Sequence, residues 1–260
     1  MTLKRLKIGA LISGSGSNLR AIMDACEDDR IDGDVVFVGS DTPDVLGLTR
    51  AQKRNIPTFV MEYGSIDRNM TMHINDFAEW GLSPKQVADY MEKSRGIIPT
   101  SIKENDQRAA WLVRRFAAER KLLHEINQYE FDLLVLAGFM KIFTAFFIDQ
   151  INTNPLKPLI MNVHPALLPA FAGTDGYGDT FNYGCKVGGS TVQFVDYGED
   201  TGPIIDQIAI SILPGESLKS FKKRGLEQEW ILYPRCIQLF AEGRLEVVTG
   251  GNGRRIVKIS

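Results

Sequence analysis

The sequence predicts an α/β protein with a Rossmann-like, doubly wound, mostly parallel sheet and a C-terminal antiparallel portion. Three observations lead to this prediction. Short apolar runs alternate with segments of helical spacing through the N-terminal half of the chain. A glycine-rich turn directly follows the first of these runs. After residue 164, two strand-like segments are joined by a polar turn, which is typical of antiparallel pairing.

Five buried strands are expected from the apolar runs at residues 6–12, 34–39, 57–61, 131–137 and 158–163. Such runs indicate a parallel sheet with helices on both faces. Apolar side chains recur at helical spacing over residues 19–26, so a helix is expected directly after the glycine turn. A second helix is expected to open at Thr42-Pro43 and to run to about Arg54, because proline is favoured at an early helical position.

The C-terminal part is expected to pair strands at 190–196 and 204–212 as a hairpin. A long helix should follow from about 217 to 241, and a last hairpin should turn at residues 250–253. We interpret residues 1–260 as one domain with an insertion at about 63–114. That stretch is too long for an ordinary strand-to-helix connection, and we expect it to pack on the surface and to include a short helix opened by Ser83-Pro84.

Composition excludes several classes of protein. The chain has 260 residues, a formal net charge of −2, 44% hydrophobic residues and three cysteines outside any CxxC pair. Such a composition is unlike that of a disordered chain, a coiled coil or a collagen-like fibre. The near-neutral charge predicts no nucleic-acid or membrane partner. We expect a cytoplasmic protein with free thiols that acts on small molecules as a monomer or homodimer.

The glycine turn at residues 13–18, SGSGSN, is the first candidate site. Glycine allows a tight turn and a close approach of backbone to ligand, and the N–H groups at a helix start attract an anion. The turn is therefore expected to bind a phosphate group. The turn lacks the third glycine of a dinucleotide site and the lysine of a P-loop. A tight turn with a Ser or Asn cap and no ligand is the alternative.

Asn162 and His164 are the second candidate site. They lie two residues apart at the end of a predicted parallel strand, so both side chains point to the same face. A histidine can act as a general acid or base near neutral pH, and an amide can donate to a developing oxyanion. The alternative is a histidine that is bonded to backbone and caps the sheet. Asp200 lies in an acidic loop that by itself would be interpreted as a solvated turn.

Four segments occur in order: SGSGSN, LAGFMKIF, NVHPALLPAFAG and DYGEDTGPII. Together they resemble the glycinamide ribonucleotide formyltransferase family of purine biosynthesis. The resemblance implies a formyltransferase fold and transfer of a formyl group from 10-formyltetrahydrofolate, as co-substrate, to the amine of glycinamide ribonucleotide. It implies direct attack of the amine through a tetrahedral intermediate, without a metal ion. The sequence likewise offers no clear metal-binding cluster, because His73, His124 and His164 are scattered along it.

The resemblance also implies roles for individual residues. Its catalytic residues fall on Asn162, His164 and Asp200, with the amide and the protonated imidazole holding the oxyanion. Its phosphate loop falls on Gly16, Ser17 and Asn18, and the glutamate that binds the ribose hydroxyls falls on Glu229. Its pterin pocket falls on Leu136, Met140, Lys141, Ile142, Val195 and Asp196, with an arginine at Arg115. For Leu136 and Ile142, a plain core role is the alternative.

Other functions remain open from the sequence. A formyltetrahydrofolate hydrolase would share the catalytic residues, but it usually carries a further N-terminal domain. Formyltransferases acting on methionyl-tRNA or on an amino sugar generally add a C-terminal domain. A non-catalytic binder of a phosphorylated metabolite is a further alternative, since Gln193 stands where the family usually has histidine and residues 174–184 lack the family's histidines.

Overall fold

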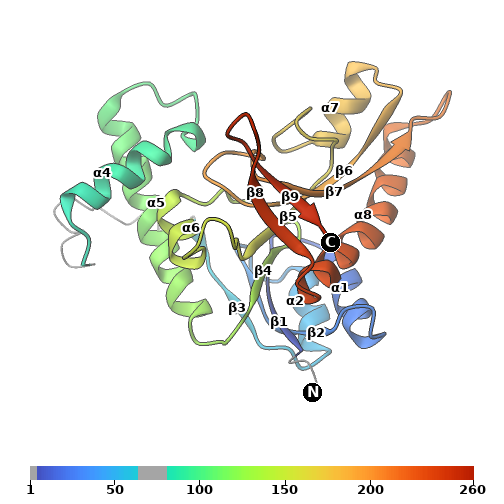
Figure 1. Ribbon diagram of the computed structural model, residues 1–260, viewed down its shortest axis with the longest axis horizontal. Helices are drawn as coiled ribbons and strands as arrows, with labels where there is room; N and C mark the ends of the chain where they lie inside the picture. Colours follow the sequence, from blue (N-terminus) through green and yellow to red (C-terminus); the bar gives the residue numbers. More distant parts are fainter. Residues whose placement is uncertain (1–4, 64–80) are drawn as a thin grey trace.

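The computed structural model describes residues 5–63 and 81–260. It contains a seven-stranded sheet and a separate two-stranded sheet (Figure 1). In chain order the elements are β1 (Leu6–Ile12), α1 (Ser17–Glu27), β2 (Gly33–Ser40), α2 (Leu46–Gln52), β3 (Thr58–Val60), α4 (Pro84–Lys93), η2 (Arg95–Ile97), α5 (Asn105–Ile126), β4 (Leu133–Leu136), α6 (Ala145–Ile151), β5 (Ile160–His164), α7 (Gly176–Tyr183), β6 (Val187–Phe194), β7 (Ile204–Ser211), α8 (Leu218–Ala241), β8 (Leu245–Thr249) and β9 (Arg255–Ile259).

The large sheet has the strand order β3-β2-β1-β4-β5-β6-β7. Strands β1 to β5 are parallel, whereas β6 and β7 are antiparallel to their neighbours. The chain moves outward from β1 to β3 and then returns to β4 on the other side of β1. This reversal places a topological switch point between β1 and β4, where ligands bind in open α/β sheets. The predicted doubly wound sheet with an antiparallel C-terminal portion is confirmed.

Both faces of the sheet are covered by helices, which explains the unbroken apolar runs in the strands. In β1, the side chains of Ile8, Ala10 and Ile12 are buried in the cluster beneath α1, α2 and α8. Leu11 points to the other face, into the cluster beneath α5 and α6. Figure 1 shows α5 and α6 on one side of the sheet and α1 and α8 on the other.

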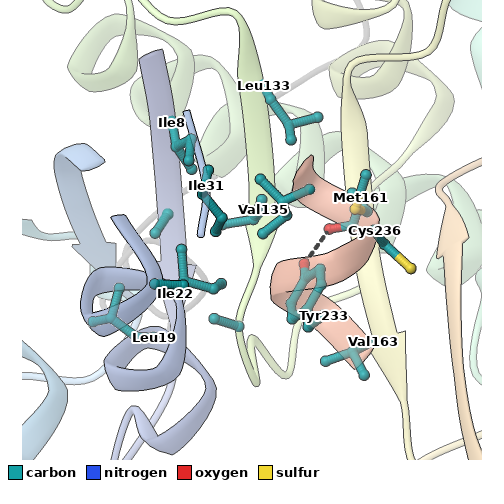
Figure 2. Packing of buried hydrophobic residues seen from close by; sticks show 14 of the residues in the cluster. Ile8, Leu19, Ile22, Ile31, Leu133, Val135, Met161, Val163, Tyr233 and Cys236 are labelled. Carbon is teal, nitrogen blue, oxygen red and sulfur yellow. Dashed lines mark hydrogen bonds between the residues drawn. The ribbon is translucent and has the colours of Figure 1, made fainter. Parts of the chain in front are cut away.

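Tyr233 connects α8 to the carboxyl ends of the central strands. The side chain is fully buried, and its hydroxyl lies 2.8 Å from the carbonyl oxygen of Met161 and 3.2 Å from that of Leu136. Figure 2 shows the ring packed beside Val163, with the hydroxyl pointing to Met161. Glu229, the residue expected to bind the ribose hydroxyls, lies about one helical turn before Tyr233. The hydrogen bonds of Tyr233 therefore also fix the segment of α8 that carries Glu229.

The second helix begins later than predicted. Helix α2 starts at Leu46, so the prediction of a start at Thr42-Pro43 was wrong. Asp44 has a φ of 56°, a left-handed conformation that cannot continue into a right-handed helix. The Ser40 hydroxyl also donates to the carbonyl of Thr42 and accepts from its N–H, which folds this segment as a turn.

The predicted insertion at about 63–114 is only partly described, because residues 64–80, with Trp80 and His73, lie outside the described residues. Ser83 opens α4 with a capping box, as the Ser-Pro start predicted. Helix α5 begins at Asn105, inside the stretch interpreted as an insertion. Val87 and Leu112 join the cluster beneath α5 and α6, so the described part of the segment contributes to the core as well as the surface.

The C-terminal segment forms the predicted hairpin, with β8 and β9 paired antiparallel. Val247 of β8 is buried in the cluster that includes α8, and β9 contacts β7. Among the described helices, none is long and apolar enough to cross a membrane.

Candidate active site

A cleft of about 430 Å³ lies at the carboxyl ends of the parallel strands. Its volume falls in the range of roughly 300–1,000 Å³ that is typical of ligand pockets. Most of the predicted site residues line it: Gly16, Ser17, Asn18, Leu136, Met140, Lys141, Ile142, Asn162, His164, Val195, Asp196, Asp200 and Glu229. The fold therefore brings segments far apart in the sequence to one cleft.

The glycine turn forms one end of the cleft. Gly16 precedes α1 with φ 65° and ψ 40°, a left-handed conformation that favours glycine. A Cβ at Gly16 would lie 2.8 Å from the Cα of Gly47, so α2 leaves no room for a side chain there. No side chain caps the start of α1 within the described residues. The first N–H groups of this helix can therefore receive an anion.

Glu229 lies beside this turn and is held from two sides. Asn18 Nδ2 donates to one carboxylate oxygen at 2.7 Å, and the hydroxyl of Tyr177 donates to the other at 2.7 Å. The residue is 4% exposed. Burial raises the pKa of Glu229, while the hydrogen bonds from Asn18 and Tyr177 and the proximity of His164 oppose that shift. The carboxylate is thus oriented by donors on both of its oxygens.

The three predicted catalytic residues converge in the cleft. Nδ1 of His164 lies 3.1 Å from Oδ2 of Asp200, and both side chains are largely buried. Nε2 of His164 lies 2.8 Å from the carbonyl oxygen of Phe171. An ionised carboxylate and a carbonyl can only accept, so a ring with a proton on each nitrogen donates to both. Asn162 lies two residues before His164 on β5 and lines the same cleft.

Asp200 is positioned by two donors in addition to His164. Gln193 Nε2 lies 3.0 Å from Oδ1, and the backbone N–H of Gly173 lies 3.0 Å from Oδ2. Gln193 is opposite Asn162 in the β5–β6 pairing, so the two residues lie side by side on neighbouring strands. The amide of Gln193 therefore donates to the carboxylate of Asp200 and supports its orientation.

The other end of the cleft is more apolar. Leu136 at the end of β4 and Ile142 in the loop after it contribute to its wall, and the segment after β6 contributes Val195 and Asp196. Lys141 Nζ lies 3.4 Å from the nearly buried carboxylate of Asp41. An apolar wall edged by a few polar groups is the usual composition of a small-molecule site.

Arg115 is absent from the lining of this cleft, unlike the other predicted site residues. Its guanidinium lies 5.3 Å from the ring of Tyr63 and 5.2 Å from the ring of Trp111. Tyr63 in turn packs against Phe139 of the loop after β4. Helix α5 thus places Arg115 behind this loop, and it does not join the other predicted pterin-pocket residues in the cleft lining.

Tyr177 and Lys222 also line the cleft, although neither was predicted from the sequence. A signal for Tyr177 was available in Gly225, because glycine inside a helix is unfavourable by about 1 kcal/mol relative to alanine. A Cβ at Gly225 would lie 2.3 Å from Cζ of Tyr177, so the glycine makes room for the ring. Within residues 5–63 and 81–260, no group of three His, Cys, Asp or Glu side chains is arranged to hold a metal ion.

Comparison with known proteins gives consistent matches. A sequence profile described as formyl transferase matches residues 6–237. Phosphoribosylglycinamide formyltransferase of Escherichia coli (strain K12) is 31% identical over 242 residues, which cover 93% of this chain and 90% of that protein.

Solved structures agree. Glycinamide ribonucleotide transformylase 1 from Symbiobacterium toebii has a TM-score of 0.70 and 33% identity, with 98% of this chain and 93% of that chain covered. Phosphoribosylglycinamide formyltransferase from Coxiella burnetii, in complex with CHES, has a TM-score of 0.72 and 26% identity, with 98% of this chain and 94% of that chain covered. Because both the profile and these relatives extend over most of the sequence, the chain belongs to the formyl transferase family and, within it, to the phosphoribosylglycinamide formyltransferases.

Proposed function

We propose that the protein transfers a formyl group from 10-formyltetrahydrofolate to the amine of glycinamide ribonucleotide in de novo purine biosynthesis. The observation that carries the proposal is the position of the His164–Asp200 pair, 3.1 Å apart, in the same cleft as the glycine turn. The cleft thus combines a candidate phosphate site at one end with an acid–base pair further along. This arrangement suits a phosphorylated acceptor whose amine lies some distance from its phosphate.

The acceptor binds at the end formed by the glycine turn. Backbone N–H groups at Gly16, Ser17 and Asn18 hold the phosphate at the start of α1. The carboxylate of Glu229 accepts hydrogen bonds from the ribose hydroxyls. Among the described residues, Asn18 Oδ1 is buried without a hydrogen-bond partner, so it provides one more acceptor beside the ribose.

The folate co-substrate fits the apolar end of the cleft. Leu136, Met140 and Ile142 give its pterin ring an apolar surface, while the backbone from Val195 to Asp196 supplies polar groups at the ring edge. Lys141, which pairs with Asp41, supplies an ammonium donor at this end of the cleft. The role of this co-substrate is to present a formyl carbon near Asn162 and His164.

The residues of the cleft then promote acyl transfer. When the amine bonds to the formyl carbon, negative charge develops on the formyl oxygen. The amide of Asn162 and the protonated ring of His164 donate to this oxygen. The charged carboxylate of Asp200 is a stronger acceptor than the neutral carbonyl of Phe171. We therefore propose that the Nε2–H of His164 leaves the carbonyl of Phe171 and donates to the oxyanion, while the Nδ1–H continues to donate to Asp200.

A proton must then move from the attacking amine to the folate nitrogen as the bond between that nitrogen and the formyl carbon breaks. Asp200 and His164 form the nearest acid–base pair, and Asp200 relays the proton through water. Asn162 needs no proton transfer, so its contribution is limited to binding the oxyanion.

The experiment mixes the protein with 10-formyltetrahydrofolate in the presence and absence of glycinamide ribonucleotide and follows the folate absorbance. Release of tetrahydrofolate only with the amine supports the proposal. Equal release in both mixtures would identify a hydrolase, and no release in either would identify a binder. Parallel reactions with an amino sugar test the other acceptor class.

A further inference from the structure

Tyr177 makes hydrogen bonds that the proposed chemistry does not by itself require. Its side chain is 5% exposed, and its hydroxyl lies 2.7 Å from Glu229 Oε1 and 2.6 Å from Ser190 Oγ. The carboxylate of Glu229 can only accept, so the single proton of the Tyr177 hydroxyl is directed to it. The Ser190 hydroxyl then donates to the tyrosine oxygen. This chain of donors ends on one defined oxygen of the carboxylate.

The ring of Tyr177 is rigidly held. It occupies the space above Gly225 of α8 and packs edge-on against Phe221, with ring centroids 5.5 Å apart. Asp175 caps α7 through the N–H of Gly178 and also pairs with Lys222 of α8 at 2.7 Å. The start of α7 is therefore bound to α8 at two points, which limits movement of the hydroxyl relative to Glu229.

An ionised carboxylate has about four lone-pair positions. In Glu229, Asn18 and Tyr177 each occupy one position, on different oxygens. Each oxygen keeps one position for a ligand, and the plane of the group is fixed. A carboxylate held in this way suits two adjacent hydroxyl groups, one for each oxygen.

We propose that Tyr177 is a positioning residue that orients Glu229 to accept from both hydroxyls of a ribose, and so determines selectivity for a ribonucleotide acceptor over its 2′-deoxy counterpart. This inference rests on the proposed function, in which Glu229 binds the ribose. It assigns no role to Tyr177 in the chemical step.

The test uses the Tyr177→Phe variant, which keeps the ring in its place and removes only the hydroxyl. The steady-state constants are measured for glycinamide ribonucleotide and for its 2′-deoxyribose analogue at saturating 10-formyltetrahydrofolate. We expect KM for the ribonucleotide to rise about ten- to a hundredfold, as for a lost hydrogen bond to a charged group. The kcat and the KM for the folate should change less than about twofold, and the ribose preference should fall towards one.

Tyr183→Phe is the matched control, because Tyr183 lies on the same helix and is 80% exposed. It should retain wild-type constants. In a Glu229→Gln background, Tyr177→Phe should add little further effect, since both changes act on one interaction. Full additivity of the two changes would overturn the inference, as would a folded Tyr177→Phe enzyme that keeps the wild-type KM and ribose preference.

A binding measurement separates failure of this inference from failure of the proposed function. Ribose 5-phosphate and 2-deoxyribose 5-phosphate are titrated calorimetrically into the wild type and Tyr177→Phe. Tighter binding of the ribose form by the wild type alone supports the role of Tyr177 even if no formyl transfer occurs. Equal preference in both proteins contradicts that role even if the enzyme is an active transferase.

Discussion

Asp200 holds His164 through a contact of 3.1 Å between Oδ2 and Nδ1, although 36 positions of chain separate them in the sequence. Asp200 itself has a φ of 54°, a left-handed conformation that is uncommon for a residue with a side chain. The donors from Gly173 and Gln193 compensate for this conformation and fix the carboxylate.

Removing the imidazole or the carboxylate should reduce turnover far more than it reduces stability. We expect His164→Ala and Asp200→Asn each to lower kcat by several orders of magnitude. Asn162→Ala should lower kcat by a factor of about 10²–10³, the usual effect of losing one oxyanion donor. Single-turnover rates with both substrates saturating measure the loss, and circular dichroism controls for folding. Near-wild-type activity of His164→Ala would refute the mechanism.

Gln193 provides a second prediction, because its amide is 2% exposed and donates to Asp200. Gln193→Leu keeps a similar volume but removes the donor, so Asp200 should lose orientation and kcat should fall about tenfold. Gln193→His, which restores the residue usual in the family, should stay within about threefold of the wild type. The measurement is kcat at saturating substrates for the wild type and both variants. Equal kcat values for all three proteins would rule out a positioning role for the amide.

Gly16→Ala tests the phosphate site. The new Cβ would lie 2.8 Å from the Cα of Gly47 at a φ of 65°, so the turn must open. We expect KM for glycinamide ribonucleotide to rise at least about tenfold. The inhibition constant of inorganic phosphate should rise by a similar factor. Gly251→Ala, in an open turn with nothing within 4 Å of the added carbon, is the control. Unchanged phosphate inhibition in Gly16→Ala would count against this turn as the anion site.

Glu119 makes stability depend on pH. Its carboxyl is fully buried and accepts from the N–H of Thr144 at 2.8 Å and from the Thr144 hydroxyl. Burial raises its pKa from the usual 4.5 to about 7, against the opposing effect of the Thr144 hydrogen bonds. Between these values the folded state binds more protons than the unfolded state. The free energy of unfolding therefore falls as pH rises through this window.

Between pH 5 and pH 8, we expect this group to lower the unfolding free energy by roughly 3 kcal/mol, at about 1.4 kcal/mol for each unit of pKa shift. Urea unfolding of the wild type and Glu119→Gln at both values measures the effect as a difference between proteins. Glutamine keeps an acceptor for Thr144 but does not titrate, so its stability should vary less. A difference between the two proteins that is constant with pH would contradict the assignment.

Tyr233→Phe should affect stability rather than chemistry. The change removes the donor to the carbonyls of Met161 and Leu136 inside the core, while the ring continues to fill its place. We expect a loss of about 1–3 kcal/mol in unfolding free energy, with kcat within about threefold of the wild type. Urea denaturation and the standard assay measure the two quantities. An unchanged unfolding midpoint would show that these carbonyls find other donors.

The sequence by itself determined the strands of the sheet, the glycine turn at 13–18 and the family. Strands buried on both faces need unbroken apolar runs, and a tight turn with a left-handed residue favours glycine. Both requirements are local and can be identified in a single segment. The pair Asn162 and His164 was equally accessible, because the two-residue period of a strand fixes their common face. The order of the motifs then pointed to Asp200.

Only the tertiary structure decided how distant segments meet. Local periodicity does not encode the contact between His164 and Asp200, the room that Gly225 leaves for Tyr177, or the position of Arg115 behind the loop after β4. The late start of α2 likewise depends on a left-handed Asp44 and the turn around it. Such features arise when residues far apart in the chain compete for the same space and the same hydrogen bonds, and this competition is resolved only in the packed fold.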